Sequence, residues 1–273
     1  MRLSSRAAII LLGIVVLGML VWGCWRQSDP WRHGKTLGAW LDQYYDASTS
    51  PGRSSPQGAQ HREEALAAIR EMGTNAIPSL LWRVRARDSS AYKRFILLMR
   101  KQSFIKLDLR GEHLRNRADW GFSILGSIGK PAIPELISLL RNDDRGVRCT
   151  AARCLGHIGP DAEVAIPALL PLLDERNYGL PILATMDALR DIHGKPDLVI
   201  PAMVEFLTGN RKEWNYSSPA MTVLRAYGAQ AASAVPAIEI YLNHPDADKR
   251  YNADSALNVI DPAAAARIGE KGH

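Results

Sequence analysis

Apolar residues between positions 144 and 173 recur at the three- and four-residue spacings of a helix. Gly159 and Pro160 end a first helix over residues 145–158. Pro167 begins a second one, because proline in the first helical turn lacks only an N–H group that has no partner there. This stretch therefore predicts a helical hairpin. One face of its first helix carries Val147, Ala151, Ala152, Leu155 and Ile158.

The same pattern returns along the chain and predicts an array of hairpins. An apolar residue followed by proline marks each copy, at Pro78, Pro134, Pro167, Pro201 and Pro236, with intervals of 56, 33, 34 and 35 residues. A glycine is expected in the turn between the two helices of each copy: Gly73, Gly129, Gly159, Gly194 and Gly228. Stacked repeats of this length form solenoids, because a single hairpin is too small to bury its own apolar face.

Comparison of the copies separates the predicted core from the predicted surface. Positions two and six residues after each proline are always apolar and predict a buried seam: Leu80, Leu136, Leu169, Met203 and Ile238, then Val84, Leu140, Leu173, Leu207 and Leu242. Positions one and four residues after it vary in chemistry and predict an exposed face: Ser79, Glu135, Ala168, Ala202 and Ala237, then Trp82, Ser138, Pro171, Glu205 and Ile240. This face is either a binding surface or simply solvated.

The clearest copy contains a set of residues at characteristic positions: Asp144, Val147, Arg148, Ala151, Ala152, Leu155, Gly156, Ile158, Gly159 and the run 166–169. In these residues it resembles the HEAT-repeat family, in particular the short bacterial HEAT-like repeat named after phycobilisome lyases. The resemblance implies an all-α, right-handed α-solenoid, an armadillo/HEAT-like superhelix of about five hairpins over residues 61–268, whose second helices line the concave side. It says little about activity, because this repeat serves many functions.

The N-terminus predicts a membrane attachment. Residues 7–25 carry no charge, and a helix of this length spans about 28 Å, close to the hydrocarbon thickness of a bilayer. Residues 1–26 are interpreted as an uncleaved signal-anchor, or as a lipoprotein signal with Cys24 as the lipidated residue, although Trp22 departs from the small residue usual in that cleavage box. We expect a membrane-anchored, single-pass protein whose body lies on the periplasmic or extracytoplasmic side. This opening also resembles a group of membrane-anchored bacterial HEAT-repeat proteins.

Residues 27–60 predict a spacer with one ordered island. Thr36 is typical of an N-cap, and the apolar residues after it predict a capping helix near residues 36–46: Leu37, Trp40, Leu41, Tyr44 and Tyr45. The alternative is a recognition surface formed by Trp40 and the two tyrosines. Residues 47–60 predict a flexible loop. At the other end, residues 249–260 predict a final half-repeat with Tyr251 on its apolar stripe, followed by no second apolar helix and by a tail at 269–273.

The 56-residue interval holds about 22 residues more than one repeat. Residues 83–117 carry 11 Lys or Arg against three acids, so this span holds +8 whereas the whole chain holds +6. An apolar stripe over residues 92–99 predicts that this basic insert extends a helix or adds one. The insert is interpreted as a solvated face, as a contact to anionic lipid headgroups, or as a site for an acidic protein or nucleic acid.

The sequence shows no pattern of catalytic or metal-binding residues. Cys149 and Cys154 are five positions apart on one helix, so their side chains diverge by about 140° and are expected to be buried and unpaired. The histidines are scattered, and His157, His193 and His244 lack a carboxylate at ligand spacing. The His-Glu pairs of HEAT-like hydroxylases, a nucleophile elbow, a P-loop and a dinucleotide fingerprint are missing. We therefore expect no enzymatic activity, no cofactor and no metal.

These patterns predict a non-catalytic protein–protein interaction scaffold, tethered to a bacterial membrane by residues 7–25 and monomeric apart from the anchor. An acidic protein is the expected partner, and an exported body disfavours nucleic acid. The alternatives are a repeat-type enzyme similar to bilin lyases, which themselves have no membrane segment, and a nucleic-acid-binding HEAT-like protein that uses the basic insert. The candidate partner-binding residues are Arg83, Arg87, Lys93, Arg94, Arg100, Lys101, Trp82, Ser138 and Glu205.

Overall fold

The computed structural model describes residues 29–49, 55–87, 110–174, 179–209 and 216–271. It divides into two compact units, Met1–Ser79 and Leu80–His273. Within the described ranges, no helix is long and apolar enough to cross a bilayer. The segment 7–25, for which the sequence predicts a membrane attachment, lies outside these ranges and stays a prediction.

The N-terminal unit combines a small β-hairpin with two helices. Strands β1 (Trp31–Arg32) and β2 (Lys35–Thr36) pair antiparallel. Helix α2 (Leu37–Thr49) follows, and helix α3 (Pro56–Met72) lies against it before the 3₁₀ segment η1 (Gly73–Ala76). Apolar side chains of both helices form the core of this unit: Leu37, Trp40, Leu41, Ala65, Ala68, Ile69 and Met72.

Helix α2 lies where the sequence predicts a helix near residues 36–46, and it continues to Thr49. The hydroxyl of Thr36 accepts a hydrogen bond from the backbone N–H of Ala39 at 3.3 Å, as an N-cap residue does. Trp40 is buried, whereas Tyr45 is 39% exposed. The alternative in which Trp40 and both tyrosines form one recognition surface is therefore wrong, because the indole belongs to the core.

The flexible loop predicted over residues 47–60 is wrong for most of its length. Helix α2 continues to Thr49, and α3 already begins at Pro56. Ser55 is the N-cap, since its hydroxyl accepts a hydrogen bond from the N–H of Gly58 at 3.0 Å, and Pro56 occupies the first turn. The Ser-Pro pair thus starts a helix, and the first repeat begins before His61.

The β-hairpin has no counterpart in the sequence prediction. Its two-residue loop consists of His33 and Gly34, whose φ angles of 46° and 77° are both positive, as in a type I′ turn. Strands of two residues are too short to show an alternating pattern. A tertiary contact holds them instead, because the indole N–H of Trp40 donates to the carbonyl oxygen of Arg32 at 2.9 Å.

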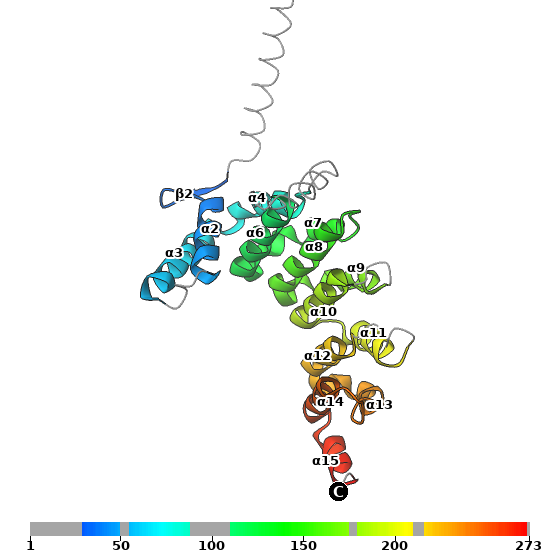
Figure 1. The fold of residues 1–273 in the computed structure, drawn as a ribbon. Helices are drawn as coiled ribbons and strands as arrows, with labels where there is room; N and C mark the ends of the chain where they lie inside the picture. Colours follow the sequence, from blue (N-terminus) through cyan, green and yellow to red (C-terminus); the bar gives the residue numbers. More distant parts are fainter. Residues whose placement is uncertain (1–28, 50–54, 88–109, 175–178, 210–215, 272–273) are drawn as a thin grey trace, which may run out of the picture. The chain divides into compact units, whose positions relative to one another are not determined.

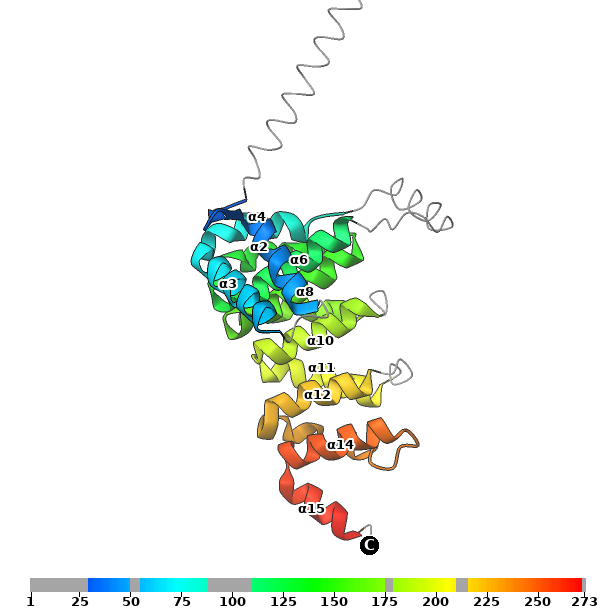
Figure 2. The ribbon, with the colours of Figure 1, turned by 60° about the vertical axis from the view of Figure 1, so that its left-hand side comes forward.

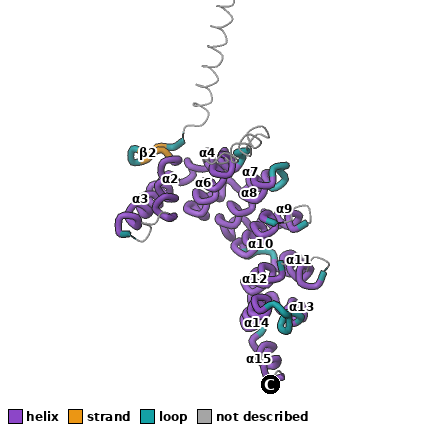
Figure 3. Tube along the Cα trace, in the orientation of Figure 1, coloured by secondary structure: helices purple, strands orange, loops and turns teal. Residues whose placement is uncertain are grey.

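The C-terminal unit stacks helical hairpins in two rows (Figures 1 and 3). Its first helices each lie against the next: α6 (Arg110–Leu125), α8 (Arg145–Ile158), α10 (Leu180–Ile192), α12 (Ser217–Tyr227) and α14 (Ala247–Ile260). The second row holds α7 (Ile133–Leu139), α9 (Ile166–Leu169), α11 (Pro196–Thr208) and α13 (Val235–Glu239), while α4 (Ile77–Val84) spans the boundary of the two units. Three 3₁₀ segments connect the rows: η2 (Gly126–Ala132), η3 (Gly159–Ala165) and η7 (Gly228–Ala234). An all-α array of hairpins is thus confirmed, and its handedness stays a prediction.

Helix α8 has the bounds that the sequence predicts. Asp144 is its N-cap, with a carboxylate oxygen that accepts from the N–H groups of Gly146 and Val147 at 2.8 and 3.2 Å. The second helix of this hairpin is α9 for four residues and then continues as the 3₁₀ segment η4 (Leu170–Leu173). Pro171 explains the change, because it has no N–H to donate to the carbonyl of Pro167.

All five predicted turn glycines lie between the two helices of their repeats, but two of them do not carry the positive φ angle of the turn. The turn residue of the second repeat is Gly126, with φ of 53°, whereas Gly129 is buried within η2. In the fourth repeat His193 and Lys195, at φ of 53° and 44°, take the left-handed conformation on either side of Gly194. Positive φ occurs as predicted at Gly73, Gly159 and Gly228.

The predicted buried seam is confirmed. The residues two positions after each repeat proline are all 0% exposed: Leu80, Leu136, Leu169, Met203 and Ile238. Four of the five residues six positions after it are buried, and Leu242 in the last copy is half-buried. Because each Leu-sized side chain contributes roughly 1.5–3 kcal/mol on burial, this seam is a main source of stability.

The end of the chain differs from the predicted half-repeat (Figure 2). Helix α15 (Pro262–Lys271) follows α14, although of residues 262–267 only Ala264 is buried. Tyr251, predicted on the apolar stripe of α14, is 71% exposed. It lies two positions before the buried Ala253, and two positions turn a helix by about 200°, to the opposite side.

Candidate functional site

A column of exposed side chains runs along the second helices. Its members stand four positions after each repeat proline, and their predicted exposure is confirmed: Trp82, Ser138, Pro171, Glu205 and Ile240. Because the residues two positions earlier form the buried seam, helix geometry turns this column outward. Its chemistry changes at each repeat, from aromatic to hydroxyl, imino ring, carboxylate and aliphatic. We name these five residues the variable column.

The neighbouring column is less exposed than predicted. Glu135, Ala168 and Ala202 are half-buried, and Ala237 is 5% exposed. One position turns a helix by about 100°, so this column lies beside the seam at the edge of the contact between helices. Of these two columns, the variable column is therefore the one that faces solvent.

Arg83 does not lie on the surface. The residue is 5% exposed and is one of the few buried charged or polar residues among those described. Its guanidinium lies over the ring of Trp82, 5.7 Å from the ring centroid. A partner cannot reach this side chain, so its predicted role in partner binding is wrong, and it supports the indole of the variable column instead.

The stems of the basic insert are bound to the repeats. Arg85 forms an ion pair with Glu135 in α7. Arg87 donates a hydrogen bond to the side-chain oxygen of Asn142, in the loop between α7 and α8. Arg115 in α6 donates to the carbonyl oxygen of Ala86 at 2.6 Å. The chain therefore leaves and re-enters the array at one place. Three cations that belong to the predicted basic surface bind atoms of the protein itself.

The central part of the insert lies outside the described residues. Residues 88–109 carry five Lys or Arg and two acids, so the stems hold more than half of the +8 of the insert. The role of the central cations and the lipidation of Cys24 stay predictions. The candidate residues concerned are Lys93, Arg94, Arg100 and Lys101.

A charged cluster joins α6 to α8. Asp119 places one carboxylate oxygen 3.1 Å from Nε2 of His157 and the other 3.3 Å from the guanidinium of Arg153. Its side chain is only 13% exposed. As predicted, no residue close to His157 in the sequence offers a carboxylate at the spacing of a metal ligand. The stacking of repeats instead brings Asp119, 38 positions away in the sequence, next to the imidazole. The sequence prediction missed this cluster, because only tertiary structure brings the two positions together.

The thiols beside this cluster are not reactive groups. Cys149 and Cys154 are 8% and 0% exposed and unpaired, which confirms the prediction. Burial raises the pKa of both thiols, so both stay protonated near neutral pH. Because the thiolate is the nucleophile, the cluster contains no activated nucleophile, and its arrangement is suited to aligning two helices.

Two further histidines act in packing. His193 stacks on Tyr227 with ring centroids 4.6 Å apart, and His244 stacks on Tyr241 at 5.7 Å. Within the described ranges, no three His, Cys, Asp or Glu side chains gather in a group that could hold a metal ion.

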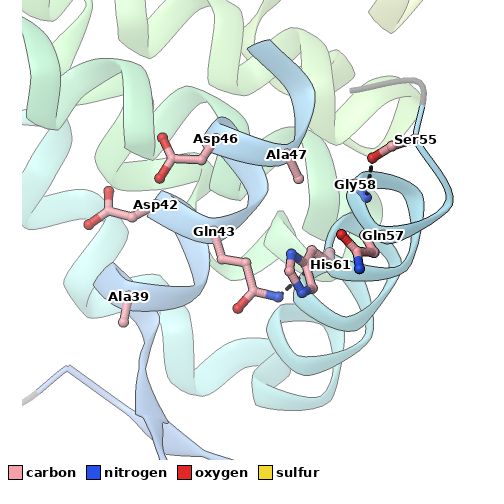
Figure 4. A pocket seen from close by; sticks show the side chains of 9 residues that line it. All are labelled: Ala39, Asp42, Gln43, Asp46, Ala47, Ser55, Gln57, Gly58 and His61. Carbon is pink, nitrogen blue, oxygen red and sulfur yellow. Dashed lines mark hydrogen bonds between the residues drawn. The ribbon is translucent and has the colours of Figure 1, made fainter. Parts of the chain in front are cut away.

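An open groove of about 600 Å³ lies between α2 and α3 of the N-terminal unit (Figure 4). Asp42 and Asp46 line one side of it, and His61 the other. Their carboxylates do not converge on the imidazole in Figure 4, so they form no acid–base pair. Gln43 spans the floor, and its amide donates to the backbone carbonyl of His61 at 2.8 Å. The sequence prediction missed this groove, because three of its nine lining residues, Gln57, Gly58 and His61, lie on α3, whose start falls within the predicted loop.

Comparison with known proteins supports the repeat family. Residues 122–190 match the family model of HEAT repeats, and this range includes the hairpin of α8 and α9. An engineered protein of known crystal structure is similar over 86% of this chain, with 19% sequence identity and a TM-score of 0.43. The chain spans 62% of the length of that protein. No curated protein matches the sequence.

Proposed function

We propose that this protein is a non-catalytic scaffold that binds a protein partner along its HEAT-like repeats. The observation that carries the proposal is the variable column, in which consecutive repeats present different exposed side chains at the same position after the repeat proline. Repeat arrays bind partners in this way, because each repeat adds its own contacts to an extended surface. The repeats themselves are proposed to be of the short bacterial type named after phycobilisome lyases.

The partner is proposed to be acidic. The support is the net charge of +8 on the insert. Its two stems are joined by the hydrogen bond from Arg115 to the carbonyl of Ala86, so both ends of the insert lie at the same edge of the array. Since Arg83 is buried and Arg87 is hydrogen-bonded to Asn142, the candidate cations that we propose to bind the partner are Lys93, Arg94, Arg100 and Lys101. Clustered charge of one sign raises the rate of association with an oppositely charged surface.

The scaffold is proposed to be held at a membrane. The support is the uncharged run of residues 7–25, which is long enough to cross a bilayer as a helix. The body is proposed to lie on the extracytoplasmic side, in agreement with the basic start of the chain. A bilin-lyase activity finds no support in the cluster of Asp119, which contains no activated nucleophile.

An affinity pull-down with the full-length protein tests the binding proposal. One variant reverses the central cations to Glu at Lys93, Arg94, Arg100 and Lys101, and another carries Trp82→Ala in the variable column. We expect both variants to lose the bound partner, the first because its charge no longer complements an acidic surface. Circular dichroism and the unfolding midpoint verify that each variant is folded.

A matched control reverses two exposed arginines outside the insert, Arg141→Glu and Arg267→Glu. We expect the control to retain the partner, because reversal there leaves the insert and the variable column intact. The same set of bound proteins from all variants would contradict the proposal. Turnover by the purified protein would contradict its non-catalytic character.

A further inference from the structure

The β-hairpin of the N-terminal unit presents a large aromatic side chain to solvent. Trp31 is 68% exposed. The loop residues His33 and Gly34 and the following Lys35 are exposed as well. An exposed indole is a typical anchor for a binding surface, because it combines a large apolar ring with a polar N–H group.

Several contacts hold the hairpin in place on this unit. The carboxylate of Glu71 in α3 accepts a hydrogen bond from Arg32 at 2.9 Å and lies 2.9 Å from Nε2 of His33. The backbone N–H of Leu37 donates to the carbonyl of Pro30 at 3.0 Å. The ammonium of Lys35 lies 4.4 Å from the centroid of the Trp40 ring. Trp31 is therefore displayed by a fixed backbone.

The chain between the predicted membrane segment and the hairpin is short. Trp31 lies six positions after the end of the uncharged run at Trp25, and seven after Cys24. Since one extended residue spans at most about 3.6 Å, the hairpin can lie no more than about 25 Å from the membrane attachment point. This limit holds for a signal-anchor and for a lipidated Cys24 alike.

We propose that the hairpin Trp31–Thr36 is a membrane-contact surface and that the indole of Trp31 inserts into the interfacial layer of a phospholipid bilayer. Tryptophan favours that layer, where its ring meets lipid and its N–H meets water and headgroups. The inference rests on the proposed tether at residues 7–25 and goes beyond it. A tether alone leaves the body free to turn, whereas a contact at the hairpin fixes which side of the N-terminal unit faces the lipid.

Quenching by brominated lipid tests this contact. Full-length protein with Trp22→Phe and Trp25→Phe, which lacks the indoles of the predicted membrane segment, is reconstituted into vesicles of phosphatidylcholine and phosphatidylglycerol. The same protein with the additional change Trp31→Phe provides the difference signal of Trp31. We expect bromine near the headgroup end of the acyl chains to reduce this difference signal. An unchanged circular dichroism spectrum shows that Trp31→Phe leaves the fold intact.

A second indole on the same unit is the matched control. Tyr45→Trp is introduced into the protein that lacks Trp31, since Tyr45 is 39% exposed and lies about 12 Å along α2 from Leu37. We expect bromine to reduce its signal less than that of Trp31. Equal quenching of the two indoles would overturn the specific role of the hairpin.

Flotation of the vesicles separates this inference from the proposed tether. If the protein floats with the vesicles but brominated lipid does not reduce the fluorescence of Trp31, the contact is overturned and the tether is retained. Protein that does not float overturns the tether, and with it the contact. Flotation together with quenching of Trp31 supports both.

Discussion

Asp119 shows how a single side chain can join two repeats. Its carboxylate binds Arg153 and His157, which lie one turn apart on α8. The side chain of Asp119 is 13% exposed and thus largely removed from solvent. A neutral side chain at this position would leave Arg153 and His157 with a weaker hydrogen-bond acceptor. An ion pair in full solvent contributes much less.

We expect Asp119→Asn to lower the free energy of unfolding by about 1–3 kcal/mol, measured by chemical denaturation. The control is Lys130→Ala, which breaks a 2.9 Å ion pair with Asp161 that also joins successive repeats. There the Lys130 side chain is 64% exposed, and we expect a loss of less than about 1 kcal/mol. Equal losses in the two variants would show that the cluster of Asp119 behaves as a surface ion pair.

The side chain of Tyr227 is expected to make the stability of the fold depend on pH. Its hydroxyl donates to the carbonyl of Gly194 at 2.7 Å, and burial, followed by the charge of Glu163, raises its pKa to about 12. In the unfolded chain a tyrosine releases its proton near pH 10. Between these two values the unfolded state loses a proton that the folded state retains, so stability falls as pH rises.

We therefore expect Tyr227→Phe to lower the free energy of unfolding by about 0.5–1.5 kcal/mol at pH 7, through the lost hydrogen bond. The stability lost in Tyr227→Phe should shrink and then reverse sign as pH rises from 10 toward 12, because ionisation costs the wild type up to about 2.7 kcal/mol whereas phenylalanine does not ionise. Urea unfolding over this range measures it. A difference that stays constant with pH would contradict the raised pKa.

At the scale of elements, the closest approach of two helices depends on a glycine. A Cβ atom at Gly156 in α8 would lie 2.9 Å from the Cα of Ala188 in α10, nearer than such atoms approach in proteins. Because a backbone atom cannot move aside as a side chain can, the two helices would have to separate. Residue size at this position thus limits how closely α8 and α10 approach each other.

We expect Gly156→Ala to lower the free energy of unfolding by about 1–3 kcal/mol, in spite of the better helix propensity of alanine. Gly146→Ala in the same helix is the comparison variant, since its Cβ would meet the end of the Arg115 side chain at 2.7 Å, which can shift although it donates to Ala86, rather than a backbone atom. That variant should lower the midpoint of thermal unfolding less than Gly156→Ala does. If both variants behave alike, the contact with Ala188 does not limit the spacing.

At the scale of the whole molecule, repeat arrays transmit stability between neighbours only. Helix α14 buries Ala253, Ala256, Leu257 and Ile260 at the last boundary and lies against α12. Its removal should therefore expose the apolar face of α12 and leave distant first helices unchanged.

We expect a chain that ends at residue 245 to lose hydrogen-exchange protection in α12 and α13 while α6 and α8 retain it. A chain that ends at residue 261 is the control, because it lacks only α15, of which one residue among 262–267 is buried. Its exchange should match the full chain in α12. Equal loss of protection in α6 and α12 would show that the unit unfolds as a whole.

The sequence alone determined the repeat architecture and the core. The apolar seam and the bounds of α8 follow from helical spacing, and Asp144 and Pro167 mark helix starts by their local chemistry. These features are predictable because they depend on neighbours within one or two helical turns. The outward position of the variable column is predictable for the same reason.

Only the tertiary structure decided which polar side chains remain available. Arg83 is buried, and Arg85 is paired with Glu135, although the charge count alone placed both in a basic surface. Asp119 meets His157 across 38 positions of sequence. Such contacts depend on how one repeat stacks on the next. The spacing of residues within one repeat does not reveal which side chains of two repeats meet. The β-hairpin beside Trp40 likewise exists because the helices behind it hold its two short strands.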